Sequence, residues 1–327
     1  MPHPLVAVTD SVFPNLDAAR TVLATVGAEL QIAADKTPNA IMRATKTADA
    51  VLVTYAQITR DMIQEMRRCR IIARFGIGVD NVDLGAATEA GIVVTKVPDY
   101  CIDEVSDHTM ALLLALARKV PLSNTRVHAG EWLMPSVVPL HRLRGSTLGL
   151  IGFGRIPQLV VPKARSFGLT VIASDPFISI DVMRQAHVES VPFDDLLARS
   201  DYISIHVPLS PGTRHLIDAA VLNRMKPTAH LINTARGSIV DEQALIDALT
   251  QGRIAGAALD VVEQEPPVPG ASLLACPNLI LTPHTAFYSE ESLVDLQTKA
   301  AEEVVRVLTG QTALNPVNSE VHPVHRS

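Results

Sequence analysis

Short apolar runs alternate with amphipathic stretches along almost the whole chain. Such runs lie at residues 6–9, 29–33, 50–54 and 70–73, and again at 148–151, 169–173, 202–205, 230–232, 256–259 and 279–281. Strands separated by helices are typical of parallel sheets that are covered on both faces. Because 327 residues exceed one typical domain, the pattern predicts an α/β protein with two doubly wound parallel-sheet domains.

Three of the helices in this pattern carry further information. The first, from Asn15 to Thr25, has Asn15 as its expected N-cap. The second, residues 103–120, has an almost wholly apolar middle, which predicts burial between domains or between subunits. The last, residues 289–309, follows the final strand and is compatible with a return to the first domain.

The composition excludes several classes of protein. The formal net charge is −6 without a long basic run, which argues against nucleic acid and anionic membranes as partners. The apolar block at 110–117 is far shorter than the ~20 residues of a membrane span. The three cysteines lack metal-like spacing, and no signal-peptide pattern follows Met1. We expect a cytoplasmic protein without a metal site.

The segment from Leu148 to Asp175 has the layout of a dinucleotide-binding βαβ unit. Gly152 permits the tight turn after the first strand, and Gly154 lets the backbone approach a pyrophosphate at a helix N-terminus. Asp175 follows the second strand, where it would accept hydrogen bonds from the ribose hydroxyls and repel a 2′-phosphate. The unit therefore favours NAD over NADP.

Two prolines depart from this pattern. Pro157 replaces the third glycine of the dinucleotide motif, although a first helical turn tolerates proline. Pro162 lies where it removes a helical hydrogen bond, at a cost of about 3 kcal/mol. We therefore expect a kinked or shifted first helix, which bears on the affinity for NAD.

Polar residues follow three strands of the second half. Arg236 comes just after the strand at 230–232, several acids follow 256–259, and His284 follows 279–281. Taken singly, a surface arginine and a structural histidine are the commoner interpretations. Because the carboxyl ends of parallel strands share one edge, the three together predict a cleft that binds an anionic carbonyl compound and moves a proton. A glutamate beside His284 would favour the protonated ring and fix its tautomer.

At this point the chain resembles the D-isomer-specific 2-hydroxyacid dehydrogenases over essentially its whole length. The matching motifs are RFGIGVDN at 74–81, GFGRI at 152–156, NTARG at 233–237, GAALD at 256–260 and TPH at 282–284. The run from 256 to 290 is most similar to the branch of the C-terminal-binding proteins, which are nuclear co-repressors, and the phosphoglycerate dehydrogenases are also close.

The resemblance implies roles for individual residues. Arg236 would bind the 2-oxo acid, His284 would be the general acid and base, and Glu265 would be its partner, with Glu263 ranked second. The backbone of Gly76, Ile77 and Gly78 would bind the substrate carboxylate. Besides Gly152, Gly154 and Asp175, the implied cofactor contacts are Phe153, Arg155, Ile156, Val207, Pro208, Thr213, Thr234 and Asp260.

The resemblance also implies an architecture. Residues 1–100 and 289–327 would form a flavodoxin-like substrate domain, and residues 101–288 would form a Rossmann NAD-binding domain inserted into it. The two would close over the substrate, with hinges near Tyr100 and Phe287. Homodimers would form through the helix at 103–120 and the arm at 126–143.

The leading hypothesis is an NAD-dependent oxidoreductase that interconverts a small 2-oxo acid and its D-2-hydroxy acid. The alternative is an NAD-sensing, co-repressor-like binding protein with little turnover, which the two prolines mildly favour. Glyoxylate, hydroxypyruvate, phosphohydroxypyruvate and bulkier 2-oxo acids all fit Arg236. Tyr55, Arg74 and Phe287 are the candidates for the specificity wall, and Arg74 would favour a phosphate.

Overall fold

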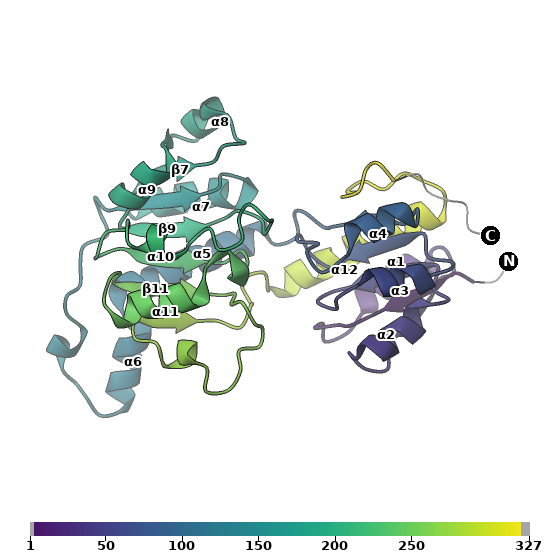
Figure 1. Ribbon diagram of the computed structural model, residues 1–327, viewed down its shortest axis with the longest axis horizontal. Helices are drawn as coiled ribbons and strands as arrows, with labels where there is room; N and C mark the ends of the chain where they lie inside the picture. Colours follow the sequence, from purple (N-terminus) through teal and green to yellow (C-terminus); the bar gives the residue numbers. More distant parts are fainter. Residues whose placement is uncertain (1–2, 322–327) are drawn as a thin grey trace. The chain divides into compact units, whose positions relative to one another are not determined.

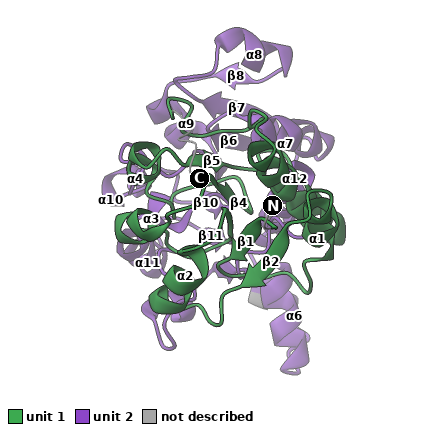
Figure 2. Cartoon of the chain, turned by 90° about the vertical axis from the view of Figure 1, so that its right-hand side faces the viewer, with its two compact units in different colours: residues 1–100, 289–327 green, residues 101–288 purple. Residues whose placement is uncertain are grey.

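The computed structural model describes residues 3–321, and the chain divides into two compact units (Figure 2). Unit 1 consists of residues 1–100 and 289–327, and unit 2 of residues 101–288. Figure 1 and Figure 2 together label most elements of the two units. Within the described part of the chain, no helix combines the length and the apolar character that a membrane crossing requires.

Unit 1 is built on a five-stranded parallel sheet in the order β2-β1-β3-β4-β5, the flavodoxin-like order. Its strands are β1 (Leu5–Val8), β2 (Glu29–Ile32), β3 (Ala50–Val53), β4 (Ile71–Arg74) and β5 (Val93–Thr95). Its helices are α1 (Asp17–Ala24), α2 (Pro38–Thr45), α3 (Arg60–Glu65), α4 (Leu84–Glu89) and α12 (Glu290–Leu308). Helices α1 and α12 lie on one side of the sheet, and α2, α3 and α4 lie on the other (Figure 2).

Helix α12 belongs to unit 1 although it follows the whole of unit 2. It begins with a capping box in which Ser289 and Ser292 each accept the other's backbone N–H. Its buried side chains recur at helical spacing and pack against α1, β3 and β4. At its other end, the Arg70 guanidinium donates to the carbonyls of Val307 and Leu308 at 2.7 and 3.0 Å. The return of this helix to the first half of the chain is therefore observed.

The segment after α12 is fastened to β5 by buried polar side chains. Asn318, which is 1% exposed, accepts the Val94 N–H at 2.8 Å and donates to the Ile92 carbonyl at 2.9 Å. The Glu303 carboxylate accepts the N–H groups of Leu314 and Asn315, both at 2.9 Å. Residues about 220 positions apart in the chain are thereby joined in one structural unit.

Unit 2 is built on a seven-stranded parallel sheet in the order β12-β11-β10-β9-β6-β7-β8. The order reverses between β9 and β6, as in a Rossmann fold. The strands are β6 (Thr147–Ile151), β7 (Thr170–Ser174), β8 (Glu189–Ser190), β9 (Tyr202–Ile205), β10 (His230–Asn233), β11 (Gly256–Leu259) and β12 (Leu279–Leu281). The α-helices are α5 (Ile102–Arg118), α6 (Val120–His128), α7 (Arg155–Ser166), α8 (Ile180–Gln185), α9 (Phe193–Arg199), α10 (Ala219–Leu222) and α11 (Glu242–Thr250), with short 3-10 turns at Met134–Val137, Gly237–Ile239 and Ser272–Ala275.

The predicted fold class is confirmed, and three local expectations are corrected. Strands β5 and β8 were not predicted, because three and two residues are too short to show a pattern. Helix α1 begins at Asp17 with Leu16 as its N-cap, and the Asn15 side chain accepts the Asp17 N–H from outside the helix. The apolar side chains of α5 are buried within unit 2, where they pack with those of β6 and α7.

The helix after the dinucleotide turn is not shifted. Helix α7 begins directly after Gly154 and runs through Pro162 to Ser166. Pro157 is the third helical residue, where its missing N–H would have no intrahelical partner in any case. Pro162 lies on the exposed side of the helix, so the carbonyl that loses its donor can be hydrated.

Candidate active site

The turn that connects β6 to α7 has the shape that a dinucleotide pyrophosphate needs. Gly152 has a φ of +90°, and a Cβ there would lie 2.9 Å from the His206 carbonyl oxygen. Gly154 is the N-cap of α7, and a Cβ there would meet open space. An anion at this point would face the free N–H groups and the positive dipole end of a twelve-residue helix. The turn therefore fits the phosphates of NAD.

Asp175 lies just after β7 and is hydrogen-bonded to this turn. Its Oδ2 accepts the Phe153 N–H and its Oδ1 accepts the Phe177 N–H, both at 2.8 Å. A carboxylate has about four lone-pair positions, so two remain for ribose hydroxyls. Phe153 is 0% exposed, with its side chain in the core, whereas Arg155 and Ile156 in the first turn of α7 are at least partly exposed.

The loop after β9 lies beside the dinucleotide turn. Val207 packs partly into the core, and the Pro208 carbonyl accepts the Thr213 hydroxyl at 2.6 Å. Thr213 therefore links the two ends of this loop. It was predicted only as a cofactor contact, and this structural role was not predicted. Burial lowers the pKa of His206 to about 3, so this ring is neutral near pH 7, and its Nε2 lies 2.9 Å from the Ser204 hydroxyl.

Arg236 occupies a turn that is organised by Asn233, the last residue of β10. The Asn233 side chain is 0% exposed, donates to the Arg236 carbonyl at 2.8 Å and accepts the Ala235 N–H at 3.0 Å. The next residue, Gly237, packs so closely on the Val262 backbone that a Cβ would lie 2.0 Å from the Val262 carbonyl. Asn233 was not among the predicted site residues, although it stands in the NTARG motif. Thr234 was predicted to face the nicotinamide, and its hydroxyl oxygen lies 3.1 Å from the hydroxyl oxygen of Thr109.

His284 and Glu265 form a close pair. Nδ1 of His284 lies 2.6 Å from Oε2 of Glu265, and the other oxygen of Glu265 accepts the Val262 N–H at 3.1 Å. The pairing favours the tautomer with its proton on Nδ1. Phe287 lies edge-on to the His284 ring, with the ring centroids 6.0 Å apart. The side chains of His284 and Glu265 are partly exposed, as groups that exchange a proton with a ligand must be.

Asp260 organises the loop that carries His284. Its carboxylate is 2% exposed and accepts the Thr282 hydroxyl at 2.6 Å and the N–H groups of Thr285 and Ala286 at 2.9 Å. The backbone carbonyl of Asp260 also accepts the His284 N–H at 2.8 Å. These bonds hold His284 at a φ of +54°, a conformation that β-carbon sterics disfavour. The prediction for Asp260 was a contact with the nicotinamide, and the structure adds this loop-holding role.

His108 is a further residue that sequence reasoning did not single out. Its Nε2 lies 3.0 Å from the Thr282 hydroxyl and 3.5 Å from Oδ1 of Asp260. It comes from α5, which contacts β10 and β11. The signal in the sequence was the triplet Ser106-Asp107-His108 at the start of an apolar helix, to which no role in the site was given.

Within unit 1, the predicted substrate residues lie at the carboxyl ends of β3 and β4. Arg74 is 8% exposed, and its guanidinium carbon lies 6.0 Å from the centre of the Tyr55 ring. The guanidinium occupies the place that a Cβ of Gly76 would take, and Gly76 has a φ of +149°. Only glycine is compatible with this arrangement. Ile77 and Gly78 continue the loop and are partly exposed.

Two buried polar residues hold these loops of unit 1. The Asp10 carboxylate accepts the Thr54 N–H at 3.1 Å and the Tyr55 N–H at 2.7 Å. The Asn81 side chain donates to the carbonyls of Thr54 and Ala56 at 3.2 and 2.9 Å. Asp10 follows β1 and Asn81 follows the 76–80 loop, so three strand ends are joined.

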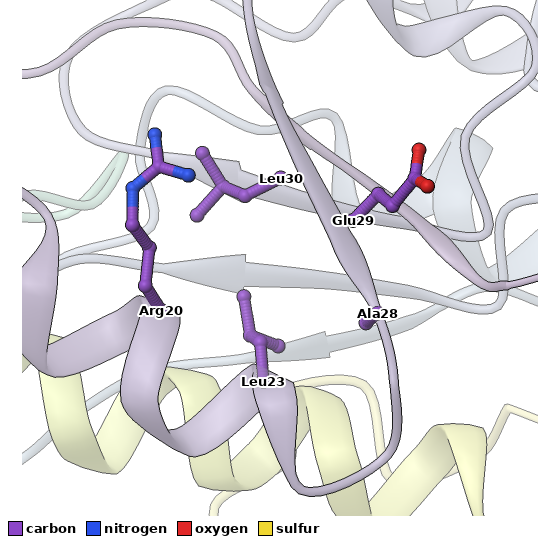
Figure 3. A pocket seen from close by; sticks show the side chains of 5 residues that line it. All are labelled: Arg20, Leu23, Ala28, Glu29 and Leu30. Atoms are coloured by element: carbon purple, nitrogen blue, oxygen red, sulfur yellow. The ribbon is translucent and has the colours of Figure 1, made fainter.

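A pocket of about 390 Å³ lies elsewhere in unit 1, between α1 and β2. Leu23, Ala28 and Leu30 line it together with Arg20 and Glu29, whose charged groups lie on opposite sides (Figure 3). It contains none of the predicted site residues. Ligand sites have convergent polar groups, and this pocket lacks that arrangement among its lining residues.

The sheet of unit 2 brings the predicted groups to one edge. Gly152, Asp175, Arg236, Asp260 and His284 each follow a strand at its carboxyl end, where ligands bind in doubly wound sheets. Residues 110–286 match the family model described as "D-isomer specific 2-hydroxyacid dehydrogenase, NAD binding domain". The chain belongs to the D-isomer specific 2-hydroxyacid dehydrogenases. Unit 2 contains the NAD-binding domain of this family.

Individual relatives agree with this membership. The D-3-phosphoglycerate dehydrogenase of Methanocaldococcus jannaschii is 41% identical over 315 residues, which are 96% of this chain and 59% of that protein. The glyoxylate reductase of Korarchaeum cryptofilum is 37% identical over 300 residues, 90% of each chain. The structure of D-lactate dehydrogenase from Aquifex aeolicus with NAD and lactic acid has a TM-score of 0.87 at 29% identity, covering 96% of this chain and 99% of that one.

The chain spans little more than half the length of its phosphoglycerate dehydrogenase relatives. It covers 59% of the protein from M. jannaschii and 55% of the one from Archaeoglobus fulgidus. It spans nearly all of the glyoxylate reductase and of the D-lactate dehydrogenase. These named relatives are dehydrogenases and a reductase, so the alternative of a binding protein with little turnover receives no support from them.

Proposed function

We propose that this protein is an NAD-dependent dehydrogenase that interconverts a small 2-oxo acid and its D-2-hydroxy acid. The observation that carries the proposal is the 2.6 Å pair of His284 and Glu265. This pair follows strands of the same sheet whose edge also carries Arg236 and the dinucleotide turn. Membership in the family supports the same reaction.

The residues of unit 2 divide the chemistry between them. His284 would donate a proton from Nε2 to the carbonyl oxygen of a 2-oxo acid and take it back in the oxidation, because Glu265 holds Nδ1. Arg236 would bind the substrate carboxylate and stabilise the charge that develops on the carbonyl oxygen, an effect worth about 3 kcal/mol for one donor. The reduced nicotinamide, when bound, supplies the hydride.

The cofactor assignment depends on Gly152, Gly154 and Asp175. The turn would cradle the pyrophosphate, and Asp175 would accept the two ribose hydroxyls. A 2′-phosphate would be placed against a carboxylate, which favours NADH over NADPH. The Asp175→Ala variant is expected to have a lower ratio of activity with NADH to activity with NADPH than the wild type.

The substrate class remains a set of named candidates. Tyr55, Arg74 and Phe287 stay our candidates for the specificity wall, and Gly76, Ile77 and Gly78 for carboxylate binding. The relatives include proteins named for 3-phosphoglycerate and for glyoxylate. The nearly buried guanidinium of Arg74 supports an anionic group on the substrate.

We further propose that the protein is a homodimer in the cytoplasm. Support for the dimer comes from the arm between α5 and β6, where Trp132, Leu133 and Met134 are 85%, 65% and 72% exposed. A cluster of large exposed apolar side chains is typical of a protein interface. Light scattering of the wild-type protein and of Trp132→Glu tests this: a dimer that dissociates in the variant supports it, and a monomeric wild type contradicts it.

The first experiment is the loss of NADH absorbance with a panel of 2-oxo acids, with NADPH in parallel. The wild type should oxidise NADH faster than NADPH with at least one acid. The His284→Asn variant should lose at least about 100-fold in turnover while it still binds NADH in a fluorescence titration. Unchanged turnover in this variant would refute the assigned proton donor.

A further inference from the structure

A second histidine–carboxylate pair lies next to the proposed catalytic one. Oε1 of Glu263 is 2.9 Å from Nε2 of His215, and both side chains are partly buried. The same carboxylate oxygen accepts the Glu242 N–H at 3.2 Å, and the Glu242 carboxylate accepts the Glu263 N–H at 3.3 Å. Glu263 therefore joins three separate segments of unit 2.

Two of these segments are already joined through their backbones. The His215 N–H donates to the Ser238 carbonyl at 2.9 Å, and the Ile217 N–H donates to the Ile239 carbonyl at 3.0 Å. Residues 215–217 therefore lie against the stretch that begins at Arg236. The pair of Glu263 and His215 attaches the 262–265 loop to this assembly.

The third segment carries Glu265. The backbone of Val262 and Glu263 in this segment packs on Gly237 and leaves no room for a Cβ at Gly237. Arg236 and Glu265 therefore belong to loops in direct contact. Glu263 is only two residues before Glu265, and the Val262 N–H between β11 and Glu263 binds the Glu265 carboxylate. A displacement of Glu263 would move Glu265 relative to His284.

His215 has a φ of +50°, the left-handed conformation that favours glycine and asparagine. Such a conformation persists where the surroundings determine it. Here the backbone N–H donates to the Ser238 carbonyl, and Nε2 of the ring lies 2.9 Å from Oε1 of Glu263. His215 is thus in contact through both its backbone and its ring.

We propose that His215 and Glu263 are positioning residues for proton transfer. They hold the 262–265 loop so that Glu265 meets Nδ1 of His284 while Arg236 keeps its place. The proposal depends on the function proposed above, because it assigns these residues to the same reaction. It also gives Glu263, ranked second as the partner of His284, a separate role.

Kinetics of matched variants test the proposal. Glu263→Ala should lower kcat about tenfold and change KM and the Kd for NADH by less than about twofold, because a misplaced proton donor slows the chemical step. Glu263→Gln keeps an oxygen beside the ring and an acceptor for the Glu242 N–H, so it should recover most of the loss. His215→Asn tolerates the left-handed backbone and removes the imidazole, and it should resemble Glu263→Ala.

The double variant separates a pair from two independent residues. His215→Asn with Glu263→Ala should be no slower than the slower single variant, because both remove the same interaction. The remote exposed pair of Arg199 and Glu189, joined at 2.7 Å, is the control, and Glu189→Ala should leave kcat within about twofold. Multiplying effects, or a loss of NADH affinity at constant kcat, would overturn the proposal.

A spectroscopic readout remains informative if turnover itself is absent. Ring ¹⁵N shifts of His284, assigned with His284→Asn, report which nitrogen carries the proton. Glu263→Ala should move these shifts and Glu189→Ala should not. Unchanged His284 shifts in a folded Glu263→Ala protein would refute the positioning role, whereas an inactive wild type with shifts that respond to Glu263→Ala would count only against the proposed reaction.

Discussion

Gly237 lies at the point where the two loops of the proposed active site touch, and its replacement by alanine gives a quantitative test. A Cβ there would lie 2.0 Å from both the carbonyl carbon and oxygen of Val262 and 2.6 Å from the Glu263 nitrogen. Real Cβ contacts are essentially never shorter than 3.0 Å. Because the obstacle is backbone, one loop must move by about 1 Å.

This displacement has two separable consequences. Overpacking in a tight site costs about 1–3 kcal/mol of stability. A misplacement of about 1 Å near reacting groups costs up to about 100-fold in rate. We therefore expect Gly237→Ala to remain folded, to lose about 1–3 kcal/mol in urea unfolding, and to lose kcat much more than its affinity for NADH.

Gly85→Ala is the matched control for this variant. A Cβ at Gly85 meets only side-chain atoms, at 3.5 and 3.8 Å. Gly85 lies inside α4 of unit 1, so alanine should stabilise it by about 0.5–1 kcal/mol and leave kcat unchanged. If Gly237→Ala kept wild-type kcat and stability, the close contact of the two loops would be wrong.

Three further predictions concern other parts of the molecule. Asp260→Asn replaces one carboxylate oxygen by an NH₂ donor, so a backbone N–H of the loop that carries His284 loses its acceptor. We expect the free energy of unfolding, measured in urea, to fall by about 1–3 kcal/mol. An unchanged free energy would argue against the described bonds. Asn318→Ala leaves the buried Val94 N–H and Ile92 carbonyl without their side-chain partner. Each unpaired group should lower the free energy of unfolding by about 1–3 kcal/mol, and a fall in the unfolding midpoint of unit 1 checks this. Burial lowers the pKa of His230 to about 4, so below about pH 6.5 the unfolded chain binds a proton that the folded chain does not. The free energy of unfolding should therefore fall as the pH drops from about 6.5 to 4. Because the buried His206 adds to the same slope, His230→Phe should reduce the slope without removing it, and an unchanged slope would contradict the assignment.

The fold was predictable because its signal is local and repeated. Runs such as 50–54 and 202–205 match β3 and β9 to within one residue, since a strand buried on both faces is a continuous apolar run. Strand β8, with only Glu189 and Ser190, carries no such signal. Helix α5 was placed correctly, but the expected burial of its apolar side chains between domains or subunits was wrong, because an apolar helix does not show which partner covers it.

The candidate site was predictable only in outline. Strand ends and motifs pointed to Arg236 and His284, but two glutamates two residues apart have the same chemistry. Distances separate them, since Glu265 lies 2.6 Å from His284 and Glu263 lies 2.9 Å from His215. The bonds of Asp260 to backbone N–H groups 25 and 26 residues away leave no pattern in the sequence.

The discontinuous composition of unit 1 has a consequence for the order in which the chain folds during synthesis. Unit 2 is one uninterrupted stretch, so all of its strands are available as soon as residue 288 leaves the ribosome. The sheet of unit 1 is made before unit 2, whereas α12 and Asn318 follow unit 2, and Asn318 must find β5 across 224 residues. Because closing long loops is slow, one face of this sheet waits uncovered until α12 has been made. Unit 1 is therefore the part of the chain that exposes apolar surface for longer during synthesis.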